Sequence, residues 1–140
     1  MSNELLAEDL HPASQRRALI ACEPGSVWLY LTKPASHDIA ADCWLLNHGE
    51  APASELLRGE GAPPPAPYEE IEPGGYPETL PAGFDLLWAD EGHTVAACAD
   101  GVVLGFIVEA RGPGQSRYLR HPGPWGRPFI QDDFSRAFGG

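Results

Sequence analysis

Short runs of apolar and β-branched residues, separated by turn residues, dominate the hydrophobic pattern of this chain. The runs at residues 18–22 and 27–32 flank a Pro-Gly turn, which predicts a β-hairpin. The next run, Ile39–Asn47, is too short for its period to separate a strand from a helix, and we favour a strand. The first third of the chain is therefore predicted to be mainly extended.

The most distinct pattern consists of three apolar runs, at residues 84–88, 94–99 and 102–110. The last two flank Asp100-Gly101, a strong hairpin signal because both central residues of a type I′ turn need positive φ. This predicts three strands of an antiparallel meander, with residues 116–119 as a candidate fourth strand. Residues 130–138 predict a short helix, in which Phe134 and Phe138 lie one turn apart.

The middle of the chain shows little hydrophobic periodicity. One helical turn is expected within residues 51–59, with Ser54 as its candidate N-cap. Residues 61–83 are rich in Pro, Gly and Glu, which predicts a long surface loop with a flexible part and polyproline character at its start. We therefore expect one domain over residues 1–140 of the α+β class, mainly β: an antiparallel meander sheet with a short C-terminal helix and a long Pro-rich loop.

The stretch FDLLWADEGHTVAACADGVVLGFIVEARGPGQSRYLRHPGPWGRPF, residues 84–129, resembles a family of small bacterial single-domain proteins of uncharacterised function. The shared features are an apolar strand ending in Trp, an acidic turn, a hairpin, and a Gly-rich turn followed by Tyr, Arg and a late Trp. The resemblance implies a fold, but no activity, cofactor or catalytic residue. The Pro-rich residues 61–83 depart from the pattern.

Charge narrows the classes of partner. Of 140 residues, 20 are Asp or Glu and 9 are Lys or Arg, so the formal net charge is -11, which repels nucleic-acid phosphates. The cations are concentrated late in the chain, where residues 111–140 contain five arginines and only two acids, Asp132 and Asp133. The C-terminal residues 111–140 are thus basic, whereas residues 1–110 are strongly acidic.

Cysteine usage and hydropathy bear on the compartment. The three cysteines, Cys22, Cys43 and Cys98, form no C-x-x-C motif and leave one over if two pair, which is typical of thiols in a reducing environment. No apolar stretch approaches the ~18 residues of a membrane span, and the N-terminus lacks the pattern of a signal peptide. We expect a soluble cytoplasmic protein with no membrane partner.

Motifs for catalysis or metal binding are missing from the sequence. The Cys and His residues lack the close spacing of zinc fingers and ribbons, so neither a metal nor a cofactor is predicted. There is no G-x-S-x-G, and each cysteine lies in an apolar run where burial makes a thiol inert. The paired carboxylates lie in polar turns, without the burial that separates the pKa values of an acid–base pair. No catalytic residue is assigned, and an enzyme is disfavoured.

The stretch at residues 116–129 is the candidate site, because it gathers cations and aromatics in an acidic chain. Alternation along a strand separates Arg117 from Arg120, and three prolines after His121 fix an extended path. We interpret it first as a strap over the sheet, with Trp125 packed on the edge beneath an arginine and the other arginines paired with the chain's own acids. A binding surface is the second hypothesis, since Trp, Tyr and Arg are typical of binding hot spots. Its residues would be Arg117, Tyr118, Arg120, His121, Trp125 and Arg127.

These features favour a non-enzymatic acidic domain that binds a basic protein, such as an immunity or inhibitor protein. One alternative is a small-molecule or anion-binding module, or an unfamiliar enzyme, that uses residues 117–127. Another is a subunit that docks into an assembly through its Pro-rich loop. The sequence leaves the partner and the oligomeric state open.

Overall fold

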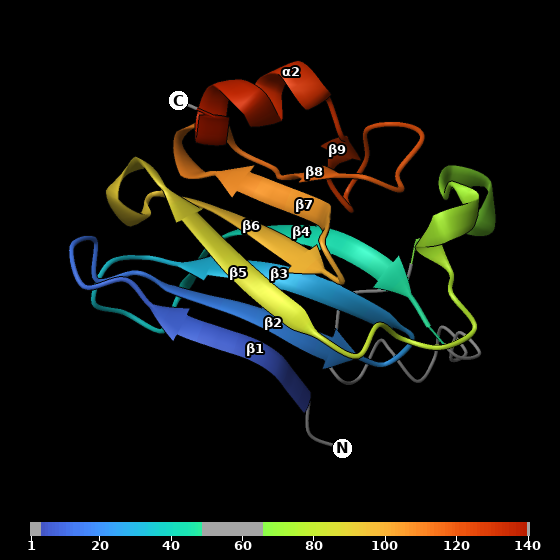
Figure 1. Ribbon diagram of the computed structural model, residues 1–140, viewed down its shortest axis with the longest axis horizontal. Helices are drawn as coiled ribbons and strands as arrows, with labels where there is room; N and C mark the ends of the chain where they lie inside the picture. Colours follow the sequence, from blue (N-terminus) through green and yellow to red (C-terminus); the bar gives the residue numbers. More distant parts are fainter. Residues whose placement is uncertain (1–3, 49–65, 140) are drawn as a thin grey trace.

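The computed structural model describes residues 4–48 and 66–139, which form two β-sheets and a short C-terminal helix (Figure 1). The first sheet is an antiparallel meander in the order β1-β2-β3-β4. Its strands are β1 (Glu4–Leu10), β2 (Arg17–Glu23), β3 (Ser26–Thr32) and β4 (Ile39–Asn47).

The second sheet is mixed and has the order β5-β6-β7-β8-β9. Its first four strands pair antiparallel, whereas β9 runs parallel to β8. The helix that follows, α2 (Gln131–Phe134), continues as the π-helical turn η5 (Ser135–Gly139). The strands are β5 (Phe84–Ala89), β6 (Thr94–Ala99), β7 (Val102–Val108), β8 (Gln115–Ser116) and β9 (Arg127–Pro128).

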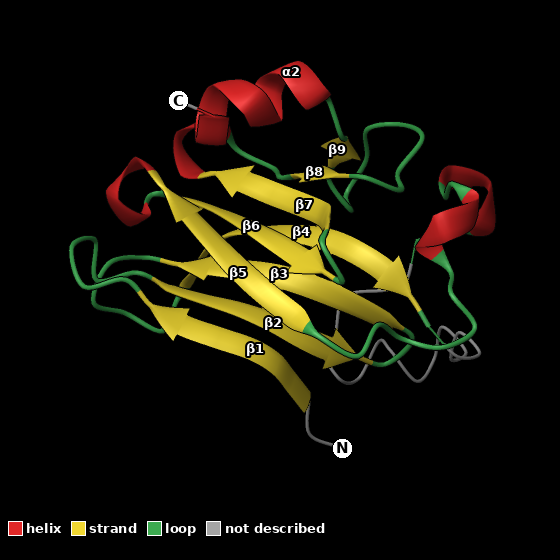
Figure 2. Cartoon of the chain, in the orientation of Figure 1, coloured by secondary structure: helices red, strands yellow, loops and turns green. Residues whose placement is uncertain are grey.

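The mainly-β class, the two predicted hairpins, the strand at Ile39–Asn47 and the C-terminal helix are confirmed. The expectation of one sheet is wrong, because the strands divide into two sheets that face each other across a shared core (Figure 2). The predicted strand at residues 116–119 is wrong beyond Ser116. There Leu119 N donates to Ser116 O in a turn, and the Leu119 side chain leaves the ladder to become buried.

The main core lies between the sheets and takes inward-facing residues from β1 to β7. On β3, alternate residues face inward. The residues paired with them on β2 and β4 face the same core. Burial of this apolar surface is the largest stabilising contribution to such a fold. The buried residues are Ala18, Ile20, Val27, Leu29, Leu31, Cys43, Leu45, Leu46, Val95, Ala97, Ala99, Leu104 and Ile107.

The two sheets are joined along β4. The backbone N–H of Trp44 donates to Trp125 O at 3.0 Å, and Gly114 N donates to Asp42 O at 3.4 Å. This close approach requires glycine, because a Cβ at Gly114 would lie 2.6 Å from the Cβ of Cys43. At the other side of the fold, Trp88 Nε1 on β5 donates to the Asp9 carboxylate on β1 at 2.8 Å.

A second, smaller core covers the outer face of β3 and β4. Trp28 and Trp44 pair directly across these strands and are almost fully buried. Against them pack Ala66 and the bridge between Ile71 and Leu119. The predicted Pro-rich loop therefore includes, within residues 66–83, the 3-10 turns η1 (Tyr68–Glu70) and η2 (Pro73–Gly75). Residues 61–65 and the turn expected at residues 51–59 with its Ser54 cap lie outside the described residues.

The C-terminal helix covers the outer face of β7 with an aromatic cluster (Figure 2). The ring of Phe106 on β7 makes edge contacts with Phe129, Phe134 and Phe138 at centroid distances of 5.5–5.8 Å. The buried Gln115 accepts from Ile130 N and donates to Asp133, each at 2.8 Å, which fixes the start of the helix.

Candidate functional site

The candidate segment, residues 116–129, crosses from the second sheet to the outer face of the first. Its backbone bonds to both: Trp125 O accepts from Trp44 N, and Phe129 N donates to Ser116 O at 3.0 Å. Tyr118 O accepts from Glu72 N at 2.7 Å, which attaches the segment to the turns at residues 68–75 as well. These bonds support the interpretation of the segment as a strap.

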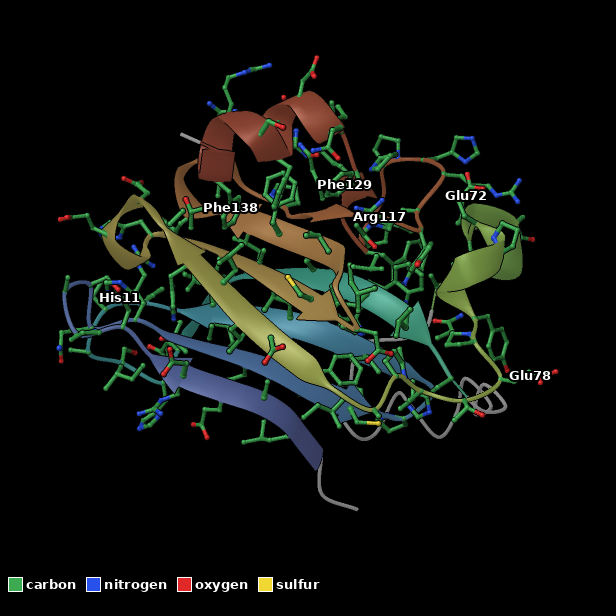
Figure 3. All side chains as sticks on the ribbon, viewed as in Figure 1. His11, Glu72, Glu78, Arg117, Phe129 and Phe138 are labelled. Carbon is green, nitrogen blue, oxygen red and sulfur yellow. The ribbon has the colours of Figure 1, made fainter. Side chains whose placement is uncertain are left out.

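Arg117 and Arg127 are directed at the chain itself. Arg117 Nε donates to Val103 O, and its guanidinium lies 4.4 Å from the centroid of the Phe129 ring (Figure 3). Arg127 donates to Pro113 O at 3.4 Å. The cation–aromatic contact was expected on Trp125, and the one seen here uses a phenylalanine that was not singled out.

Arg120 and His121 point to the other side, toward the glutamates of residues 69–72. Arg120 Nε donates to Ile71 O at 2.9 Å and lies 4.0 Å from the Glu72 carboxylate. His121 Nδ1 lies 3.0 Å from Glu70 Oε1. These contacts agree with the expected pairing of late cations with acids elsewhere in the chain.

The two remaining members of the set, Tyr118 and Trp125, pack beside the buried tryptophan cluster and are partly exposed. Their neighbours Arg117 and Arg120 face different surroundings, so the contacts among the described residues do not bring the six predicted side chains together. The binding role of Arg117, Tyr118, Arg120, His121, Trp125 and Arg127 stays a prediction.

A cavity of about 360 Å³ lies elsewhere, between the C-terminal helical turns and the ends of β6 and β7. Two cations line it, Arg111 and Arg136, although Arg136 is also 3.6 Å from Asp133. Sequence reasoning counted these arginines among the basic C-terminal residues but could not place them together, because they are 25 residues apart. Arg127 lines a much smaller cavity of about 10 Å³. The other residues that line the large cavity are Asp90, Thr94, Val108 and Ala137.

One group of acidic side chains belongs to the end of the molecule where β5 begins, β6 turns into β7, and residues 66–78 lie, and Figure 3 labels Glu72 and Glu78 there (Figures 1 and 3). Nearly all of them are exposed. The sequence contains these acids but does not show that the fold brings them to one end. We call this group the acidic end: Glu69, Glu70, Glu72, Glu78, Asp85 and Asp100.

At the opposite end two arginines are paired with carboxylates. Arg16 lies 3.4 Å from Glu109, and Arg17 lies 2.9 Å from Glu8. Arg16 is buried and also donates to Thr32 O and to His93 Nδ1, at 3.1 and 3.0 Å. This end also has exposed acids, Asp38, Asp90 and Glu91, but Arg16 and Arg17 offset part of the negative charge there.

Ionisable groups in the sheets are shifted mainly by burial. Burial, reinforced by the nearby charge of Asp42, raises the pKa of the Cys43 thiol. Burial and then the charge of Asp85 raise the pKa of Cys98. The pKa of Tyr30 is raised by burial and by the hydrogen bond that its hydroxyl donates to Glu23 at 2.7 Å. Within residues 4–48 and 66–139, no three His, Cys, Asp or Glu side chains are grouped to hold a metal ion.

Compared with known protein families, curated proteins and solved structures, the chain shows no significant match. The resemblance noted for residues 84–129 therefore stays a prediction. No helix in the described part of the chain is both long and apolar enough to cross a membrane.

Proposed function

We propose that this chain is a non-enzymatic domain that binds a basic protein through its acidic end, as an inhibitor or immunity protein would. The proposal is carried by the exposed acids of the acidic end, whereas the other end contains Arg16 and Arg17, which are paired with carboxylates. A surface of one sign steers and accelerates encounter with a partner of the opposite sign.

The local pairing at the acidic end is weak enough to be exchanged. Arg120 and Glu72 are 4.0 Å apart, and their side chains are 46% and 49% exposed. Exposed ion pairs of this kind contribute ~0–1 kcal/mol. A partner's arginine that approaches Glu72 more closely would replace Arg120 at little cost. Such an exchange would give Arg120 and His121 a role at the rim of the interface.

The proposal is tested first by capture from the native host at low and moderate salt, and then with the purified partner. Glu69→Gln with Glu78→Gln removes two exposed charges from the acidic end, and Asp38→Asn with Glu91→Gln removes two exposed charges elsewhere. We expect the first variant to associate several-fold more slowly at low salt, and the difference to shrink at high salt.

The matched variant, Asp38→Asn with Glu91→Gln, should associate at the rate of the unaltered chain, because the charges that it removes lie away from the acidic end. Recovery of no basic partner, or equal slowing in both double variants, would contradict the proposal. A change in the dissociation rate alone would also argue against electrostatic steering.

A second candidate function is the binding of a small anion in the cavity beside Arg111 and Arg136. Its volume, about 360 Å³, is within the range of ligand sites, and two arginines line it against one acid, Asp90. Calorimetric titration with phosphate and with citrate tests this function. We expect binding that Arg111→Gln with Arg136→Gln abolishes, while Arg17→Gln, outside this cavity, leaves it unchanged. Absence of binding by the unaltered chain would reject it.

A further inference from the structure

Cys22 and His48 meet at the end of the first sheet, although 26 residues separate them. Cys22 is the penultimate residue of β2, and His48 directly follows β4. The Cys22 Sγ lies 3.1 Å from His48 Nε2. A thiol within hydrogen-bond reach of an imidazole is the arrangement found in activated cysteines.

The hydrogen bonds of His48 define where its proton lies. Its Nε2 is 3.0 Å from Glu23 O, and a carbonyl oxygen only accepts, so Nε2 carries a hydrogen. The same N–H therefore faces the Cys22 sulfur. The backbone N–H of His48 donates to Gly25 O at 3.0 Å, which holds the residue over the β2–β3 turn. A donor N–H at this distance stabilises negative charge on a sulfur that attacks an external reagent.

The other two cysteines serve as an internal comparison. Cys43 is fully buried, and its thiol donates toward Trp44 O and Gln115 O, each at 3.4 Å. Cys98 is partly exposed like Cys22, but burial and then the charge of Asp85 on the paired strand raise the pKa of its thiol. Cys22 is partly exposed and faces a nitrogen donor instead. Among the cysteines, the geometry of Cys22 is the one that suits reaction with an external reagent.

We propose that Cys22, activated by His48, is a site of covalent modification by peroxides. The thiolate sulfur attacks one oxygen of hydrogen peroxide, an S–O bond forms and the O–O bond breaks. The leaving hydroxide takes a proton from solvent to give water. Sulfur is oxidised by two electrons to a sulfenic acid, and the peroxide is reduced by two. The inference is independent of the proposed partner.

The experiment treats the folded chain with hydrogen peroxide at pH 7, traps sulfenic acid with dimedone, and measures each cysteine by peptide mass spectrometry. We expect Cys22 to react roughly tenfold faster than Cys98, and also roughly tenfold faster than Cys22 in the urea-unfolded chain. His48→Asn should remove this advantage. His37→Asn, which alters an exposed histidine in the β3–β4 turn, should leave it unchanged.

A second measurement needs no variant. Between pH 7.5 and 6 the reaction of an ordinary thiol slows by roughly thirtyfold as its thiolate is lost. The rate at Cys22 in the folded chain should fall by less than tenfold over that interval, while the unfolded chain shows the full decrease. Equal rates at Cys22 and Cys98, an ordinary pH profile, or an unaltered rate in folded His48→Asn would each overturn the proposal.

Discussion

At the scale of single residues, Arg16 is the side chain on which one end of the fold depends. It is 7% exposed and its guanidinium reaches Thr32 O, His93 Nδ1 and the Glu109 carboxylate, which lie on both sides of the core. Arg16→Met would leave these acceptors without their donor, and because Glu109 is 38% exposed the expected cost is that of unsatisfied hydrogen-bond acceptors, about 1–3 kcal/mol.

Urea unfolding followed by circular dichroism measures this loss. Arg17→Met is the matched control, because Arg17 makes an exposed ion pair with Glu8 and its loss should cost less than about 1 kcal/mol. Equal destabilisation by the two substitutions would show that Arg16 acts as an ordinary surface cation.

Tyr30 makes stability depend on pH in the alkaline range. Burial and the hydrogen bond to Glu23 raise its pKa in the folded chain above the ordinary value of 10.0. Above about pH 10 the unfolded chain therefore releases the Tyr30 proton while the folded chain keeps it, so the free energy of unfolding falls as pH rises. Below pH 10 the contribution is fully present.

Comparison with Tyr30→Phe isolates this contribution, since Cys43 and the other titrating groups stay in both chains. At pH 8 the variant should be less stable by about 1 kcal/mol, the value of a lost hydrogen bond. The difference between the two chains should then shrink between pH 9 and 11 in urea titrations. Stability curves that stay parallel over this interval would contradict the assignment.

At the scale of elements, the C-terminal helix is short and depends on aromatic contacts rather than on its own hydrogen bonds. The Phe138 ring stacks on Phe134 at 4.6 Å and meets Phe106 edge-on at 5.8 Å. An isolated helix of this length is unstable, so Phe138→Ala should detach it. We expect a loss of about 1–3 kcal/mol in the local stability of residues 131–138.

Amide hydrogen exchange distinguishes this local opening from general destabilisation. Exchange in residues 131–138 should accelerate, while the amides of β2 and β3 keep their protection. Leu87→Ala serves as a control, because Leu87 is 45% exposed on β5 and its truncation should leave helix exchange unaltered. Uniform acceleration across both sheets would show that the helix and the sheets unfold as one unit.

The sequence predicted the elements that depend on neighbouring residues, such as turns and hairpins. Asp100-Gly101 marks a hairpin by its turn chemistry, and the structure has positive φ at both residues. The strand at Glu4–Leu10 was not predicted, since ELLAEDL contains good helix formers and few β-branched residues. Its extended form comes from pairing with β2, and the division into two sheets likewise depends on packing between distant strands.

For the whole molecule, the sequence predicted the sign of the charge but not where the fold places it. A strap over the sheet was expected from the prolines and alternating cations of residues 116–129, whereas its contact with β4 and the Phe129 partner of Arg117 were not. No sequence motif indicates the contact between Cys22 and His48. The two residues lie at the ends of different strands and meet only when β2, β3 and β4 have paired.

The net charge of -11 should make the stability of the whole chain depend on ionic strength. Acids such as Glu78 and Asp85 are exposed and form no ion pair among the described residues, so their mutual repulsion in the compact state exceeds that in the unfolded chain. Raising NaCl from 10 to 200 mM shortens the screening length from about 30 Å to about 7 Å. We expect the melting temperature to rise by a few degrees over this interval.

The acidic end should account for much of this response. Glu78→Gln with Asp85→Asn should raise the melting temperature at 10 mM NaCl and reduce the further gain on adding salt, because fewer charges remain to be screened. Asp38→Asn with Glu91→Gln removes the same formal charge away from that end and should have a smaller effect. If both double variants responded alike, repulsion would be spread over the whole surface, and the acidic end would lose its distinction as the place where a basic partner gains most by binding.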